Sequence, residues 1–240
     1  MISRGYAWSR SCILPSGEMR TRTLAALLAL VLAGCGPTLQ GYAVRHPAAD
    51  ESRRVAEFLD PLLMALELPS LRAIALAKDC KIGFAIVRTD RVNVWSSPAT
   101  TSPCLYFTLF LTEGALRMPA DQLMATIAHE LGHLALHHTP GPDTPQLTAS
   151  PEQWQGIQEQ ELAADRFAVA LLKRTQSLYR VGACEAMAEF LRRSVSDWYG
   201  PGISARMHAA VTQRADAADA ACASTEVTAL PRLTLNTRVQ

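Results

Sequence analysis

The sequence predicts a single α+β domain that is mostly helical and carries a small antiparallel sheet. Segments rich in β-branched and aromatic residues gather in the first half of the chain, and most segments with helical periodicity follow them. Strands followed by helices are typical of the α+β class. No internal repeat is present, and 49% of the 240 residues are hydrophobic, so the chain can bury a substantial core.

The expected strands come first along the chain. Alternating and β-branched residues predict strands at residues 82–89, 92–95 and 105–111. Two prolines and several serines and threonines predict a loop over residues 96–104. Together these segments favour a small antiparallel sheet.

Helical periodicity and start signals predict five helices. They cover residues 50–66, 120–138, 151–174, 183–196 and 205–223. Pro61 lies inside the first helix and can kink or split it. Pro119 and Asp121 mark the start of the second helix. The expected domain is therefore residues 50–223, followed by an irregular tail over residues 224–240.

The charge balance excludes one broad class of function. The chain has 23 basic and 22 acidic side chains and a formal net charge of +1. No basic block is present that could neutralise phosphates, so nucleic-acid binding has no electrostatic basis.

The N-terminal region has the pattern of a secretory signal. Arg20 and Arg22 precede a leucine, alanine and valine run over residues 24–33, which is shorter than the roughly 20 residues that span a bilayer. We expect residues 1–34 to be a signal peptide, with Met19 as a more economical start. Residues 32–35, Leu-Ala-Gly-Cys, resemble a bacterial lipobox, in which Cys35 becomes the lipidated first residue. An ordinary signal peptide without lipidation is the alternative.

A lipidated Cys35 predicts where the protein resides. Residues 35–49 contain glycines and prolines and read as a tether. Gly36 is not the aspartate associated with inner-membrane retention. We therefore expect a lipoprotein on the periplasmic face of the outer membrane of a Gram-negative bacterium, with the lipid as its sole membrane contact.

The cysteine count agrees with export. Apart from Cys12 and Cys35 the chain has four cysteines, and an even number in an oxidising compartment favours two disulfides. Sequential pairing, Cys80–Cys104 and Cys184–Cys222, is the expected connectivity because each pair brackets one local unit. The other two connectivities, and four free thiols, are the alternatives.

The segment His129-Glu130-Leu131-Gly132-His133 carries the strongest chemical signal. Histidines at i and i+4 share one face of a helix, so both can ligate one metal ion, and Glu130 can act as general base. Two surface histidines on a helix are the alternative. Gly132 is costly in a helix and indicates that another element approaches closely there.

A zinc site with an open position needs a third protein ligand, and the next helix offers one. Glu161 and Asp165 lie four residues apart and face the same way among apolar neighbours. Glu161 could complete a His₂Glu site while Asp165 supports a ligand histidine. Glu159 is a competing ligand, and two solvated carboxylates are the alternative.

These motifs together resemble a known family. HELGH followed by His138, then Glu-x-x-Ala-Asp on a later helix, is similar to the gluzincin endopeptidases of peptidase family M, number forty-eight. That family includes CAAX prenyl endopeptidases, HtpX heat-shock proteases and periplasmic quality-control peptidases. The resemblance covers roughly residues 85–214, where residues 92–95 resemble the strand before the zinc helix and His208 with Arg214 resembles a later His-Pro…Arg element. Ala209 replaces the usual proline, and the strand lacks the usual Asn-Ala start.

The resemblance implies a zincin-like minimal metallopeptidase domain with one Zn²⁺ per chain. By analogy the ligands are His129, His133 and Glu161, the base is Glu130, and Asp165 supports the site. His208 or Arg214 would stabilise the oxyanion or hold the site together. His138 lies about 500° around a continuous helix from His133, so His137 and His138 are expected to be surface or supporting groups.

The implied function is hydrolysis of misfolded or stalled cell-envelope proteins. Water attack assisted by Glu130 would cleave the peptide bond, and the outer-membrane assembly machinery is a candidate partner. The alternative from another class is a zinc-bound periplasmic chaperone or binding module without turnover. A CAAX processing enzyme fits less well, because it needs a membrane cavity that a chain of this length cannot build.

Overall fold

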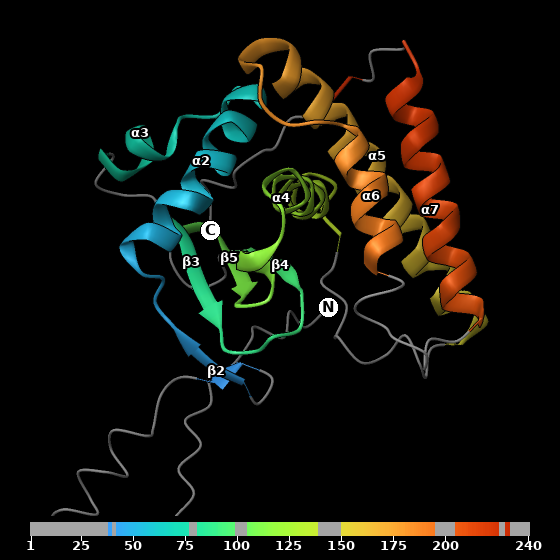
Figure 1. Cartoon of the computed structure of the whole chain (residues 1–240), viewed down its shortest axis with the longest axis horizontal. Coiled ribbons are helices and arrows are strands. Elements are labelled where there is room, and N and C mark those ends of the chain that lie inside the picture. The colour runs from blue at the N-terminus through green and yellow to red at the C-terminus, as the bar shows by residue number, and fades with distance from the viewer. Residues whose placement is uncertain are drawn as a thin grey trace, which may run out of the picture.

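The α+β class is confirmed by the computed structural model, which describes residues 38–39, 42–76, 81–98, 105–138, 150–194, 205–225 and 229–230 (Figure 1). The strands are β1 Thr38–Leu39, β2 Tyr42–Arg45, β3 Lys81–Val87, β4 Val94–Pro98 and β5 Leu105–Thr112. The helices are α2 Ala49–Ala65, α3 Leu71–Leu76, α4 Ala120–Ala135, α5 Pro151–Tyr179, α6 Glu185–Arg193 and α7 Ala205–Ala223, with a short 3₁₀ turn at Ala115–Arg117.

Several predicted features lie outside the described residues. They are the signal peptide over residues 1–34, the lipidation at Cys35, the Cys80–Cys104 disulfide and most of the tail over residues 224–240. None of the described helices has the length and apolarity needed to cross a bilayer.

The sheet is mixed, so the expectation of an antiparallel sheet is wrong for one strand pair. The strand order is β1-β2-β3-β5-β4, and β3 pairs with β5 in parallel while the other pairs are antiparallel. The chain runs out along β3, back along β4 and out again along β5. Because β5 inserts between the two earlier strands, it lies beside β3 in the same direction.

Strand β4 extends beyond its predicted end. It runs over Val94–Pro98 instead of residues 92–95, so Ser96 and Ser97 belong to the strand and not to the expected loop. Proline is tolerated at the end of a strand when that strand lies at the edge of a sheet, as β4 does. The edge position explains why a segment with loop-like composition is extended.

The expected tether over residues 35–49 is in part a strand. β2 pairs with β3 through Val44 opposite Val87 and Arg45 opposite Ile86. Arg45 then binds Glu51 at the start of α2 through two contacts of 2.6 and 2.7 Å. Its Nε also lies 3.2 Å from Glu113, just after β5. The N-terminal strand is thus fixed to both layers of the fold.

The predicted helices are present, but several of them begin or end at other residues than predicted. α2 is one helix despite the buried Pro61, and α3 was not predicted. α4 ends three residues before the expected His138, and α5 continues five residues past its expected end. Ser150 caps α5 by accepting a hydrogen bond from the Gln153 N–H at 3.3 Å.

Helix α4 is the centre of the molecule. Figure 1 shows it end-on between the sheet and the group formed by α5, α6 and α7. Three leucine and isoleucine side chains spaced four residues apart are fully buried, namely Leu123, Ile127 and Leu131. A helix that is apolar on most of its circumference has to be enclosed by other elements, as this one is.

The close approach predicted at Gly132 is confirmed, and the approaching element is α5. A β-carbon on Gly132 would lie 3.0 Å from the carbonyl oxygen of Ala164 and 3.2 Å from its Cα. It would also lie 3.2 Å from the ring of Phe167. The two helices therefore meet backbone to backbone at this residue.

A disulfide joins Cys184, just before α6, to Cys222 near the end of α7, with a Cα–Cα distance of 5.6 Å. This confirms one of the two predicted pairs. The Lys173 ammonium group of α5 donates to the carbonyls of Ala221 and Ser224 beside it. The end of α7 is thus fixed to α6 by a covalent bond and to α5 by hydrogen bonds.

We expect Gly132→Ala to lower the free energy of unfolding by about 1–3 kcal/mol, because the backbone of α5 cannot yield as a flexible side chain would. This cost exceeds the roughly 1 kcal/mol that alanine gains over glycine in a helix. Urea unfolding measures the change. Gly156→Ala on α5 is the matched control, since nothing lies within 4 Å of its β-carbon, and it should stabilise by about 0.5–1 kcal/mol. An equal gain in both variants would show that the two helices can separate freely.

The Arg45–Glu51 pair predicts a pH-dependent stability. The hydrogen bond from Arg45 lowers the pKa of Glu51 from 4.5 to about 2. A depressed carboxyl pKa stabilises the fold above pH 4.5, and the contribution is lost as the pH falls towards 2. Because the two side chains are 26% and 21% exposed, we expect about 1–2 kcal/mol at pH 7.

Urea unfolding of the wild type and Glu51→Gln at pH 7 and pH 3 tests this contribution. The difference between the two proteins should shrink at the lower pH. Glu57→Gln, an exposed position on the same helix, should differ from the wild type by less than about 0.5 kcal/mol at both values. A difference for Glu51→Gln that is the same at both values would contradict the prediction.

Candidate metal centre

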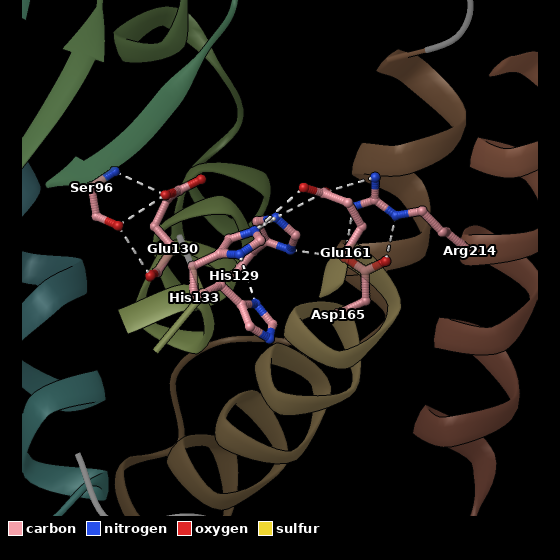
Figure 2. A network of polar contacts seen from close by, with 8 residues as sticks. Ser96, His129, Glu130, His133, Glu161, Asp165 and Arg214 are labelled. Carbon is pink, nitrogen blue, oxygen red and sulfur yellow. Dashed lines mark hydrogen bonds and ion pairs between the residues drawn. The ribbon is translucent and has the colours of Figure 1, made fainter. Parts of the chain in front are cut away.

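Helix α4 brings the two predicted histidine ligands together. The Nε2 atoms of His129 and His133 lie 2.9 Å apart, and the rings meet edge to face (Figure 2). The spacing of four residues places both rings on the face of α4 that looks towards α5. His129 is 7% exposed, and burial among packed helices fixes its ring.

Glu161 on α5 reaches both histidines, as predicted. Its Oε2 lies 3.4 Å from Nε2 of His129, and its Oε1 lies 3.5 Å from Nε2 of His133. Tetrahedral zinc with bonds of about 2.0–2.1 Å separates its ligand atoms by about 3.3–3.4 Å. Distances of 2.9–3.5 Å between the three donors bracket this value, so two imidazoles and one carboxylate fit a zinc ion.

Glu130 is a second carboxylate near the histidines, and Ser96 distinguishes its role from that of Glu161. Glu130 has an oxygen within 4.8 Å of the donor nitrogens of both histidines. The N–H of Ser96 donates to Oε2 of Glu130 at 2.8 Å, and the hydroxyl of Ser96 donates to the same atom at 3.1 Å (Figure 2). Glu161 spans both histidines while Glu130 is held from the sheet, which favours Glu161 as ligand and Glu130 as base.

Sequence reasoning missed Ser96 because it placed this residue in a loop. The structure places it in β4, at the edge of the sheet beside α4. Its hydroxyl also lies 3.3 Å from the backbone oxygen of Glu130. Recognising that an edge strand tolerates Pro98 would have extended the strand far enough to include Ser96.

Asp165 and Arg214 support the ligands from behind. Nδ1 of His129 lies 2.8 Å from Oδ1 of Asp165, which is buried. Arg214 on α7 donates to both oxygens of Asp165, at 2.6 and 2.9 Å, and lies 2.9 Å from Glu161 (Figure 2). One guanidinium therefore pairs with two carboxylates, and Asp165 and Arg214 lie in the supporting positions that the sequence predicts.

The charged groups around His129 and Glu161 shift the pKa values of both side chains. Burial lowers the pKa of His129, but hydrogen bonds and charges of Asp165 and Glu161 outweigh it and raise the pKa to about 10. Burial raises the pKa of Glu161, but the charges of Arg214 and His129 hold it below its usual range. The two carboxylates thus favour a positive charge at this position. A site that attracts a cation in this way suits a divalent metal ion.

Two further groups have shifted pKa values. Burial raises the pKa of Glu130 to about 7, although the charge of His129 and the hydrogen bonds from Ser96 oppose this rise. Burial and the charge of His129 lower the pKa of His133 to about 3, so its Nε2 is available as a neutral ligand.

His138 takes the second of the two roles expected for it. Its Nδ1 lies 2.9 Å from Nδ1 of His133, so it is a supporting group. The estimate of 500° around the helix fails because α4 ends at Ala135 and His137 adopts a left-handed φ of 55°. His137 itself is exposed, as expected of a surface residue.

His208 is not brought to the metal site. It is exposed on α7, and Thr212 contacts both its ring and its backbone carbonyl. His208 lies six residues before Arg214, which corresponds to about 9 Å along the helix and about 120° around it. When Arg214 faces the site, His208 therefore lies on a different side of α7. The geometry does not support the oxyanion role expected for His208.

Comparisons with known proteins find one similarity. A family model described as Peptidase_M78, IrrE N-terminal-like domain, matches residues 112–179. The match covers less than a third of the chain, but it includes α4, α5 and all of His129, Glu130, His133, Glu161 and Asp165. No curated protein and no solved structure matches the chain.

The match therefore shows a likeness to a zinc metallopeptidase-like family over the two helices that carry the site. It is not a match to family M forty-eight, which the motifs resemble.

Arg214→Gln should lower the free energy of unfolding by about 3–5 kcal/mol, because it removes the guanidinium that pairs with Asp165 and Glu161 and leaves His129 as the cation that faces both carboxylates. Urea unfolding of the metal-free protein measures the loss. Arg192→Gln is the control, since Arg192 is half exposed and pairs with Asp216 and Asp219 on the surface of α7. Exposed pairs contribute about 0–1 kcal/mol. Similar losses in both variants would mean that Arg214 is no more than a surface cation.

Proposed function

We propose that this protein is a zinc-dependent endopeptidase. The observation that carries the proposal is the convergence of two imidazole nitrogens and one carboxylate within 2.9–3.5 Å, with Glu130 beside them. Three protein ligands and one open position are the pattern of catalytic zinc, whereas structural zinc has four protein ligands. The likeness of residues 112–179 to a metallopeptidase-like family supports the same conclusion.

The residues around the site can perform peptide hydrolysis. When bound, zinc supplies the Lewis acidity that polarises a peptide carbonyl. Glu130 takes a proton from the attacking water and then gives it to the leaving amine. Burial raises the pKa of Glu130, which favours its acting first as proton acceptor and then as proton donor, and the two hydrogen bonds from Ser96 hold the carboxylate in place.

Ligand orientation comes from Asp165. Because His129 uses Nε2 as the donor atom, its proton resides on Nδ1, which lies 2.8 Å from Asp165. Arg214 fixes this carboxylate through two hydrogen bonds and limits the negative charge of the site. The histidine ring is therefore oriented before any metal binds.

The edge strand β4 supports an extended peptide as the substrate. In the part of the chain that the structure describes, β4 pairs with β5 on one side alone and packs against α4, and its Ser96 contacts the proposed base. An extended segment can add to such an edge as a further strand, which presents its peptide bonds in line with the site. Folded proteins seldom offer such segments, so unfolded chains are the proposed substrate class.

We further propose that the substrates are misfolded or stalled proteins of the cell envelope, in the manner of the quality-control members of family M forty-eight. The basic and apolar pattern before Cys35 supports export, lipid attachment and a position on the periplasmic face of the outer membrane. The Cys184–Cys222 disulfide supports an oxidising compartment. The outer-membrane assembly machinery is the proposed partner.

Glu130→Gln tests the proposal. The variant should keep about one zinc per chain and lose at least about 10²-fold in the cleavage rate of a reduced, unfolded protein, because the general base is absent. Zinc is measured by plasma mass spectrometry and cleavage by the release of new amino termini. His129→Ala, His133→Ala and Glu161→Ala should lose both zinc and activity.

Glu159→Gln is the matched control, since Glu159 is an exposed carboxylate of α5 two residues from the proposed ligand. It should retain both zinc and activity. A wild-type rate in Glu130→Gln would remove Glu130 from the mechanism. A wild-type protein that binds zinc and an unfolded chain without cleaving it would identify a binding module instead.

A further inference from the structure

We infer that His138 is a positioning residue for the zinc ligand His133, whose Nδ1–H it accepts as a hydrogen bond. The inference rests on the proposed zinc site and extends its supporting groups beyond Asp165 and Arg214. It is carried by one contact and by the backbone turn that creates it.

The contact leaves a single arrangement of protons. A neutral imidazole has one N–H, and a nitrogen that binds metal carries none. Nε2 of His133 faces Nε2 of His129 and Glu161, at 2.9 and 3.5 Å, and when this atom holds the metal the proton of His133 resides on Nδ1. Nδ1 of His138 lies 2.9 Å from that atom and must act as the acceptor, which places the proton of His138 on its Nε2.

The backbone after α4 is shaped to make this contact. The N–H of Leu136 still donates to the carbonyl of Gly132 at 2.9 Å, and His137 then turns into the left-handed region with a φ of 55°. The N–H of His138 donates back to the carbonyl of His133 at 2.9 Å, as in a Schellman cap. His138 is thus bound to His133 by backbone and by ring. A left-handed residue other than glycine costs about 1–2 kcal/mol, so this turn is maintained against strain.

Charge explains why an imidazole and not a carboxylate stands behind His133. The site already contains three carboxylates, those of Glu130, Glu161 and Asp165. Their charge would be balanced by a divalent metal ion together with Arg214. A carboxylate at position 138 would leave the centre with an uncompensated negative charge in a partly buried place. The neutral ring orients His133 without adding charge.

Two substitutions of nearly equal shape separate the hydrogen bond from packing. In His138→Asn an amide oxygen stands three bonds from Cα, where Nδ1 stood, whereas His138→Leu has no acceptor at that place. The dissociation constant for Zn²⁺ alone is measured by competition with a chromogenic chelator. Loss of such a supporting group weakens metal binding by roughly 10–100-fold. We expect that loss in His138→Leu and recovery of most of it in His138→Asn.

His137→Asn is the control, because asparagine tolerates the left-handed turn and the side chain of His137 is exposed. It should bind Zn²⁺ within about twofold of the wild type. The thermal unfolding midpoints of the metal-free proteins are compared first, and His138→Asn and His138→Leu should agree closely.

Equal zinc affinities of His138→Leu and the wild type would overturn the inference, as would equal losses in the asparagine and leucine variants. Complete loss of zinc in His138→Leu, as in His133→Ala, would overturn it too, since His138 would then be a ligand. Failure of the proposed function has a different signature, because a wild-type protein without stoichiometric zinc, or an active Glu130→Gln, would reject the catalytic centre itself.

Discussion

The contact between α4 and α5 at Gly132 is the constraint on which the site depends. His129 and His133 come from one helix and Glu161 from the other, and the donor atoms must lie within a few tenths of an ångström of tetrahedral spacing. The close approach of Gly132 to the backbone of Ala164 places α5 where Glu161 reaches both rings. The sheet on one side of α4 and α6 on another hold this helix against α5.

The negative charge of the site is partly balanced by α7, a helix that is remote from the ligands in sequence. Arg214 lies about fifty residues after Glu161, and the packing of α7 against α5 returns it to Asp165 and Glu161. The Cys184–Cys222 disulfide fixes the far end of the same helix to α6. The position of this cation therefore depends on three helices and one covalent bond.

The parts of the site that sequence predicts are those defined by helical spacing. His129 with His133, and Glu161 with Asp165, each share a helix face at four residues apart, which no tertiary detail can alter. Ser96 was assigned to a loop, and the contact of His138 with His133 was not foreseen, because both depend on where a strand or a helix ends. Those ends are determined by edge pairing and by a left-handed turn, both of which composition describes poorly. The sheet was misread for a related reason, since strand order depends on which strand inserts between two others.

Arg214 and His208 show the same limit within one helix. Both were expected near the metal, and the sequence offers no way to rank them. The two residues are separated by about 120° around α7, so only one of them can face Asp165 while the apolar residues of α7 pack against α5. That residue is Arg214.

The left-handed turn at His137 makes the number of residues between His133 and His138 as important as their identities. An insertion or deletion of one residue there would preserve every metal ligand and yet rotate the imidazole of position 138 out of reach of its partner. The sequence motif is therefore the ten-residue segment 129–138, in which the last histidine must stand five residues after His133. Related chains that share HExxH but shift this register would need a different acceptor behind the second histidine, supplied by another part of the fold.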